Sequence, residues 1–229
     1  MVITTTARAP FEKIFMDIVG PITTSYKNNS YILTIQDDLT KYSLAIPIPR
    51  HDANTIAKEF VEKFVCFHGA PKSIVSDQGS DFLSKVFTSC CKLLKIEKFH
   101  TTAYHPQADG ALERSHRTLA EYLCHYVDKN LQDWDEHIPA HFMFVYNTTP
   151  HSTTERQPYE LLYGKPAEVP NSHSRTEEVR YNYDDYCYEL KQRLQRARDA
   201  ARDTIVKKKE KSKALYDRNA KPITVHVGD

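Results

Sequence analysis

The first fifty residues carry short hydrophobic runs that predict three β-strands. These runs cover residues 11–20, 31–39 and 42–49, and they are separated by a Gly-Pro pair and by a tight polar turn. Short strands with such brief connections are typical of an antiparallel meander. One carboxylate, Asp17, interrupts the first hydrophobic run.

The hydrophobic period lengthens after position 52, which predicts a helix. Asp52 is a suitable N-cap, and Gly69 followed by Pro71 ends the helical pattern. The hydrophobic side chains expected on one face of this helix are Ile56, Phe60, Val61, Phe64 and Val65.

A strand, a helix and a second strand are predicted next, at 73–77, 84–95 and 96–101. Ser84 is placed to cap the helix at its N-terminus. The side chains expected to point inward from this helix are Val86, Phe87, Cys90, Leu93 and Leu94.

Three further helical segments are predicted, at about 110–129, 134–147 and 158–164. An antiparallel meander followed by β-α-β alternation predicts an α/β protein with a mixed five-stranded sheet and helices on both faces. The pattern lapses over 166–185, which predicts a linker, and a long amphipathic helix is expected over about 184–219. We expect a packing seam along one side of it, formed by Tyr186, Leu190, Leu194, Ala197, Ala201 and Ile205.

Length and composition fit one globular domain with an appendage. The 229 residues are 40% hydrophobic and 27% charged, and no hydrophobic run reaches the length of a membrane span. The five cysteines, an odd number with two of them adjacent, argue against a disulfide framework. We therefore expect a reduced, intracellular protein without a membrane partner.

Charge is distributed unevenly, although the net charge is only +1. Residues 186–221 hold 12 Lys and Arg against five Asp and Glu, a net +7, whereas the rest of the chain holds 19 against 25, a net −6. The C-terminal helix is thus a basic arm on a mildly acidic body, which suits binding to a phosphate backbone. A solvated helix face without a ligand is the alternative interpretation.

Three carboxylates stand at two strand positions and at one helix start. Asp17 lies inside a hydrophobic strand, Asp77 ends another strand, and Glu113 stands at the start of a helix. Each has a simpler structural interpretation. Asp17 could turn to solvent, and Asp77 could form an Asp-x-Gly turn. Glu113 could be favoured by the helix dipole or could pair with Arg117.

Together the three acids predict a metal site at one end of the sheet. Carboxylates that converge repel one another unless a cation neutralises them, and hard oxygen ligands suit Mg²⁺ or Mn²⁺. Two such ions would stabilise the attacking and leaving oxygens of a phosphoryl transfer. Nearby His116, Arg117 and the aromatic Tyr104 could then hold a phosphodiester backbone and a splayed DNA end.

Five segments resemble, in the same order, the integrases of gypsy-type LTR retrotransposons and, more distantly, retroviral integrases. They are FEKIFMDIVGP, SDQGSDF, AYHPQADGALERSHRTL, DWDEHIPAHFMFVYN and PYELLYGKP, and they cover about residues 8–166. The resemblance implies an RNase H-like core with a D,D,E triad at Asp17, Asp77 and Glu113, the last two separated by 35 residues. It also implies two divalent ions, trimming of element DNA 3′ ends and joining of those ends to target DNA.

The same resemblance implies DNA contacts in the loop before the catalytic Glu and in the helical turn after it. Ala111 and His116 stand where many relatives carry Gln and Asn, whereas Arg117 matches a basic position of the family. The implied DNA-contacting residues are Tyr104, His105, Pro106, Gln107, Gly110, His116 and Arg117.

The implied organisation of the chain has five parts. They are a lead-in (1–10), the catalytic core (11–165), the linker (166–185), the basic helix (186–221) and the start of a C-terminal DNA-binding module (222–229). The family's His2Cys2 zinc domain would precede the core, and no zinc-like pattern is present there, so zinc is not expected.

The favoured hypothesis is a catalytic integrase core that acts on element and target DNA, as a homo-oligomer and in the nucleus. A domesticated or decayed fragment that binds DNA without catalysis is the second hypothesis, and an RNase H-like nuclease that only cuts is the third. The intact triad favours the first hypothesis, whereas the missing flanking domains favour the second.

Overall fold

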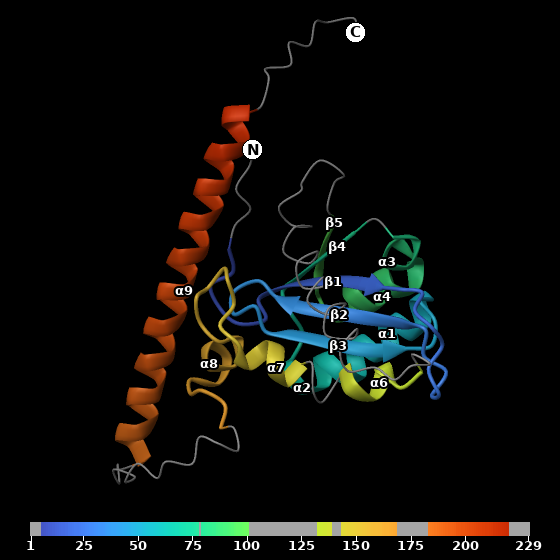
Figure 1. The fold of residues 1–229 in the computed structure, drawn as a ribbon, viewed down its shortest axis with the longest axis horizontal. Helices are drawn as coiled ribbons and strands as arrows, with labels where there is room; N and C mark the ends of the chain where they lie inside the picture. The colour runs from blue at the N-terminus through green and yellow to red at the C-terminus, as the bar shows by residue number, and fades with distance from the viewer. Residues whose placement is uncertain (1–5, 78, 101–131, 139–142, 169–182, 220–229) are drawn as a thin grey trace, which may run out of the picture.

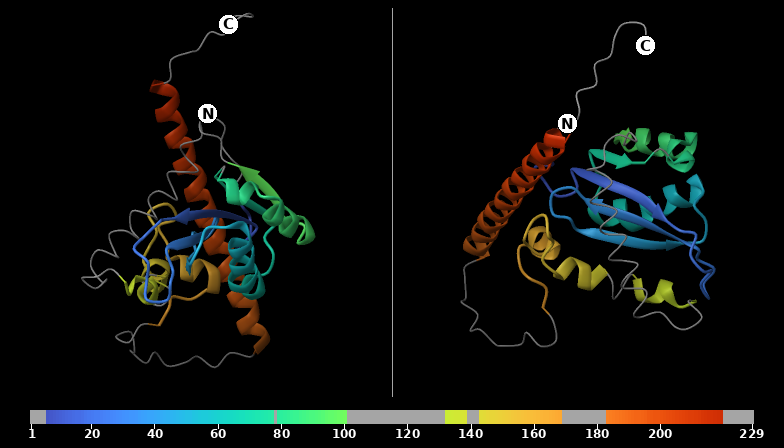
Figure 2. Two further views of the ribbon diagram at one scale, coloured as in Figure 1. Left: turned by 90° about the vertical axis from the view of Figure 1, so that its right-hand side faces the viewer. Right: turned by 45° about the horizontal axis from the view of Figure 1, so that its top comes forward.

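The computed structural model describes residues 6–77, 79–100, 132–138, 143–168 and 183–219. Within these ranges the chain forms a five-stranded mixed sheet with helices on both faces and a long C-terminal helix beside it (Figure 1, Figure 2). The fold class predicted from the sequence is confirmed.

The five strands all fall within segments that the sequence pattern predicts. They are β1 (Lys13–Val19), β2 (Tyr31–Asp37), β3 (Ser43–Ile48), β4 (Ser73–Ser76) and β5 (Glu97–His100). Their order in the sheet is β3-β2-β1-β4-β5. β1, β2 and β3 form the antiparallel meander, whereas β4 runs parallel to β1 and β5 runs parallel to β4.

The helices divide between the two faces of the sheet. One face is covered by α1 (Ala53–Phe60), its continuations η1 (Val61–Val65) and α2 (Cys66–His68), then α3 (Ser80–Leu83) and α4 (Lys85–Leu93). The other face carries α6 (Trp134–His137) and α7 (Met143–Thr148). They are followed along the chain by α8 (Pro158–Tyr163) and α9 (Tyr183–Asn219). In the described ranges, no helix is both long enough and hydrophobic enough to cross a bilayer.

Separate hydrophobic clusters fill the two sides of the sheet. Leu33 packs with Phe60 and Phe87 in the larger cluster, and Ile32 packs with Trp134 in the smaller one. Because side chains alternate between the faces of a strand, these neighbours on β2 enter opposite clusters. The sheet is therefore buried on both sides near its centre.

The helix after β3 begins and ends at the predicted residues. Oδ1 of Asp52 accepts the N–H groups of Asn54 and Thr55 at 3.2 and 3.1 Å, which caps the helix. Gly69 ends it with a φ of +85°, a conformation that favours glycine. The π-helical turn η1 between α1 and α2 is not predicted by the sequence pattern.

The inward face of α4 differs from the predicted one. Ser84 caps the helix as expected, because its hydroxyl accepts the N–H of Phe87 at 3.2 Å. Phe87 and Cys91 are buried, whereas Val86 is 45% and Leu93 is 84% exposed. Cys91 and Leu93 are two residues apart, about 200° around a helix, so they cannot both face the core. The inward orientation predicted for Val86 and Leu93 is wrong.

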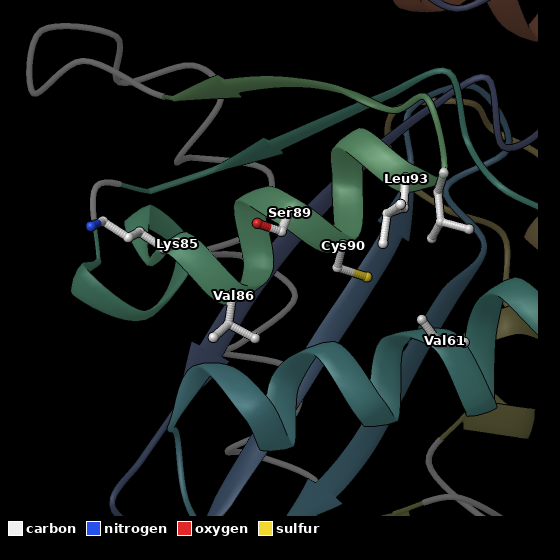
Figure 3. Close-up of a pocket in the computed structure, with 7 residues that line it drawn as sticks. Val61, Lys85, Val86, Ser89, Cys90 and Leu93 are labelled. Atoms are coloured by element: carbon white, nitrogen blue, oxygen red, sulfur yellow. The ribbon is translucent and has the colours of Figure 1, made fainter.

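The outward side chains of α4 border an open apolar groove of about 570 Å³ (Figure 3). Val86 and Cys90 point from α4 toward the helical segment that carries Val61, and Leu93 lies at the far end of α4 (Figure 3). The groove is therefore a surface feature between α4 and η1.

The C-terminal helix α9 is packed against the body. Ala201 and Ile205 are fully buried, and the guanidinium of Arg198 donates to the carbonyls of Leu161 and Leu162 at 3.0 Å each. The predicted packing seam is confirmed at these two hydrophobic positions.

The seam begins later than predicted, at Leu190 rather than at Tyr186. Leu190 and Leu194 lie so close to Gly164 that a β-carbon there would come within 2.8 Å of each side chain. Tyr186 is one turn before this contact and is 48% exposed, so its place in the seam is wrong.

A buried ionic cluster, which we term the Asp38 junction, joins α9 to the sheet. Asp38 lies 3.4 Å from Nζ of Lys41 and 4.0 Å from Nζ of Lys13, and its Oδ2 accepts the N–H of Ala7 at 3.1 Å. Burial alone would raise the pKa of Asp38, but these two lysines and Lys209 of α9 lower it below its ordinary value. The junction stands at the end of β2 and the start of β1.

Candidate active site

Two of the predicted catalytic acids lie side by side at the ends of neighbouring parallel strands. Asp17 belongs to β1, and Asp77 follows β4 directly. The register pairs Met16 with Ser76, so the next residues along the two strands are Asp17 and Asp77. Because adjacent strands are about 4.8 Å apart, the two acids are close backbone neighbours.

Asp17 is half-buried at this end of β1. Its Oδ1 accepts the N–H of Ile18 at 2.8 Å, and its backbone carbonyl accepts the hydroxyl of Thr34 at 3.1 Å. Met16 and Ile18 pack into the larger core on one face, so strand alternation places Asp17 on the opposite face. Its side chain is therefore excluded from the larger core, and local hydrogen bonds orient it.

Asp77 is exposed and forms the turn that leads into α3. Its Oδ1 accepts the N–H of Gly79 at 3.0 Å, which is the Asp-x-Gly turn expected as its structural role. The approach is close, because a β-carbon at Gly79 would lie 3.0 Å from that oxygen. The turn thus orients the carboxylate, so that a structural role and a ligand role are compatible.

The other residues predicted for the site lie outside the described part of the chain. They are the third acid, Glu113, and the DNA-contacting residues Tyr104, His105, Pro106, Gln107, Gly110, His116 and Arg117. The described residues hold no group of three or more His, Cys, Asp or Glu side chains that could bind a metal. The structure thus brings together Asp17 and Asp77, and the full triad stays a prediction.

Two residues of β5 that the sequence does not single out contact Asp77 or the helices that follow it. His100, at the end of β5, has its Nδ1 3.3 Å from the carbonyl of Asp77. Lys98 donates to the carbonyl of Phe82 at 2.5 Å and to the hydroxyl of Thr88 at 3.0 Å, so it ties β5 to α3 and α4. Burial lowers the pKa of Lys98. These contacts come from residues distant in the sequence, so no local motif could have revealed them.

A hydrogen-bonded pair joins the segment after β3 to α3 at the same end of the sheet. Nδ1 of His51, which follows β3, lies 2.7 Å from Oδ2 of Asp81 in α3. The ring of His51 also meets the ring of Tyr31 edge-on, with centroids 4.7 Å apart. No sequence pattern indicates this pair, because its two members are 30 residues apart.

The family of the chain follows from comparison with known proteins. Residues 7–106 match the family model described as "Integrase core domain". The chain contains an integrase core domain. That match includes both Asp17 and Asp77 and ends at residue 106, before Glu113.

Retroelement polyproteins are similar to this integrase core in sequence. A retrovirus-related Pol polyprotein from transposon 412 of Drosophila melanogaster is 38% identical over the whole chain, which spans 19% of that protein. The Gypsy retrotransposon integrase-like protein 1 of Bos taurus is 25% identical over 71% of the chain, which spans 32% of that protein. The Pol polyprotein of Radiation murine leukemia virus (strain Kaplan) is 34% identical over 62% of the chain, which spans 24% of that protein. The chain thus corresponds to a third or less of each relative.

Solved retroviral integrases share the fold of this integrase core. The HTLV-2 integrase catalytic core domain, in complex with magnesium in a trimeric form, gives a TM-score of 0.54 at 17% identity and covers 67% of this chain and 97% of its own. The catalytic core domain of BIV integrase gives 0.50 at 22% identity and covers 66% and 93%. At these identities the likeness shows the fold, which is the predicted RNase H-like one.

Proposed function

We propose that this integrase core catalyses DNA integration, by trimming the 3′ ends of element DNA and joining them to target DNA through phosphoryl transfer. The observation that carries the proposal is the placement of Asp17 and Asp77 at the ends of parallel β1 and β4, within the matched integrase core domain. Glu113 would complete the catalytic triad.

The described carboxylates fit a divalent cation. Asp17 and Asp77 offer hard oxygen donors, and a backbone N–H fixes Oδ1 of each carboxylate. We propose that they hold Mg²⁺ or Mn²⁺, two ions in all, together with Glu113. When bound, such ions stabilise the charge on the attacking and leaving oxygens of phosphoryl transfer. The HTLV-2 core, which shares the fold, was solved with magnesium.

Strand transfer or its reversal on branched DNA tests the proposed reaction. Glu113→Gln, Asp17→Asn and Asp77→Asn each remove one negative charge with little change in shape. We expect each variant to fall to the background rate in Mg²⁺ or Mn²⁺. Glu62→Gln, an exposed position on η1, is the matched control and should keep the wild-type rate. Equal activity of the wild-type protein and Glu113→Gln would refute the proposed metal-dependent mechanism.

A non-catalytic DNA-binding module is the second candidate function, and the outward face of α9 favours it. Arg198, Lys208 and Lys209 of α9 are bonded to the body of the protein. Arg196 and Lys207 are exposed on the opposite side of the helix from Ile205. The surface available to DNA is therefore narrower than the charge count of the segment indicates.

Charge reversal tests whether this surface of α9 binds DNA. We expect Arg196→Glu/Lys207→Glu to weaken DNA binding and to flatten its dependence on salt by roughly 0.9 in log–log slope for each phosphate that the protein no longer neutralises. Lys58→Glu/Lys63→Glu, on exposed positions of α1 and η1, reverses the same charge elsewhere as a control. An α9 variant with the wild-type affinity and salt slope would refute a role for this face.

We propose that the chain self-associates and acts on chromosomal DNA in the nucleus. Two proteins with the same fold support an assembly, because one was solved in a trimeric form. The other is an intasome of simian T-cell lymphotropic virus in complex with PP2A regulatory subunit B56 gamma, with a TM-score of 0.53 at 17% identity over 76% of this chain.

A further inference from the structure

The His51–Asp81 pair spans the end of the sheet at which the two acids lie. His51 follows β3 and Asp81 follows β4, and β2 and β1 lie between these strands in the sheet. Asp81 is four residues after Asp77 in the chain. The bond therefore links the segment after β3 to α3, across the edge of the sheet where β2 begins and β1 ends.

His51 is held between the sheet and the start of α1. The residue after it, Asp52, caps α1 and also accepts the hydroxyl of Thr55 at 2.7 Å. Tyr31, against whose ring His51 packs, is paired with Ile48 at the end of β3. The position of the imidazole is thus set by the sheet and by the start of α1.

Asp81 belongs to a short segment that is held at several points. The next residue, Phe82, is buried with its ring 5.6 Å from that of Phe87. The N–H of Leu83 donates to the carbonyl of Gly79 at 3.1 Å, and the N–H of Gly79 donates to Asp77. Asp81 therefore lies within a turn whose first residue, Gly79, is bonded to the carboxylate of Asp77.

We propose that His51 is a positioning residue for Asp77, acting through Asp81 and α3. The inference rests on the proposed function, because it gives the Asp77 carboxylate a catalytic role. The side chains of His51 and Asp81 are 50% and 24% exposed, and a pair this open contributes little to global stability. Its removal should loosen the acidic site without unfolding the chain.

The test compares three variants of the full chain with a matched control. His51→Ala removes the donor, His51→Asn keeps an N–H donor at the position of Nδ1, and Asp81→Asn removes the charged acceptor. His137→Ala, the control, removes a similar His–Asp bond of 3.0 Å to Asp133 at α6. Three quantities are measured for each protein, namely the affinity for Mn²⁺ alone, the rate on branched DNA, and amide exchange over 79–83 without metal.

We expect His51→Ala and Asp81→Asn to lower the Mn²⁺ affinity or the rate by about 10- to 100-fold, as the removal of a residue that orients a metal ligand does. Amide exchange over 79–83 should rise, and the melting temperature should stay within about 2 °C of the wild type. His51→Asn should recover most of the loss, and His137→Ala should match the wild type. The double variant His51→Ala/Asp81→Asn should be no worse than the poorer single variant.

The failures of the two proposals can be told apart. If Asp77→Asn abolishes activity while His51→Ala keeps the wild-type rate, Mn²⁺ affinity and exchange, the role of His51 is refuted and the proposed function stands. If the wild-type protein is inactive, the Mn²⁺ affinity and the exchange over 79–83 decide, and equal values in His51→Ala refute the positioning role. A fall in melting temperature that accounts for the whole effect would also overturn it, because His51 would then be a general structural residue.

Discussion

The Asp38 junction gives a stability prediction that can be worked from the structure. The side chains of Asp38, Lys41 and Lys13 are 1%, 5% and 17% exposed, so the ions are largely removed from water. Asp38→Asn keeps the shape of the side chain and removes its charge. The variant removes one buried counter-ion from the lysines of the junction.

The expected cost follows from the distances. At 3.4 and 4.0 Å, and with an effective dielectric constant of about 20, Asp38 attracts Lys41 and Lys13 by roughly 5 and 4 kcal/mol. The desolvation of the carboxylate, several kcal/mol, offsets part of this attraction. Removing one partner of such a buried pair typically costs about 3–5 kcal/mol, because the remaining charges stay buried. We expect that loss in the free energy of unfolding.

Urea denaturation of the full chain measures the loss. The single tryptophan, Trp134, is buried in the smaller core and reports on the body, whereas far-UV circular dichroism also reports on the 37 residues of α9. Glu136→Gln breaks the exposed pair with Lys27 and should change stability by less than about 0.5 kcal/mol. A loss below about 1 kcal/mol for Asp38→Asn would refute the reasoning, since the lysines would then have found water or other partners. Removing Lys41 as well, in Asp38→Asn/Lys41→Met, should restore part of the loss.

Two further predictions concern pH and self-association. The pKa of Asp38 is lowered in the folded protein, so its contribution is present above the unfolded value of about 3.9 and is lost as the pH falls through the folded pKa. The difference in free energy of unfolding between the wild type and Asp38→Asn, measured by urea denaturation, should therefore narrow on acidification. A constant difference would contradict the stabilising role of the ionised Asp38 carboxylate. Leu93→Glu places a charge on the apolar groove of α4, and sedimentation should show weaker self-association if a second copy of the chain covers this surface. Tyr188→Glu, at a 67% exposed position of α9, is the control, and equal association of both variants would exclude the groove as the interface.

The acidic pair was predictable because strand pattern and chain direction determine it. The hydrophobic runs locate β1 and β4, and the helix between β3 and β4 allows the chain to return for a parallel pairing. Once those strands are parallel neighbours, Asp17 and Asp77 share one end of the sheet. What the pattern could not show is that a backbone N–H fixes Oδ1 of each carboxylate, because those bonds depend on local geometry.

The face of α4 was not predictable, because hydrophobic residues surround most of that helix. More than one face of this helix has hydrophobic residues at helical spacing, among them Val86, Phe87, Cys91 and Leu93. Periodicity alone does not decide which of these faces is buried. Packing decides, because the ring of Phe87 fits beside Phe60 and Phe82 in the larger core. Val86 and Leu93 are then left on the surface.

The position of α9 relative to the acidic pair indicates that the basic segment does not contribute directly to the acidic site. Lys209 joins the Asp38 junction beside Lys13, the first residue of β1, whereas Asp17 lies near the last. Asp17 is four residues after Lys13 in β1, about 13 Å along the strand, and the outward cations of α9 face away from the body. If Arg196 and Lys207 hold DNA, we expect that DNA to be a different segment from the one that meets Asp17 and Asp77 of the same chain. Variants of that face should change DNA affinity while the metal dependence of the acidic site stays constant, so that binding by the helix and catalysis by the sheet are separable by mutation.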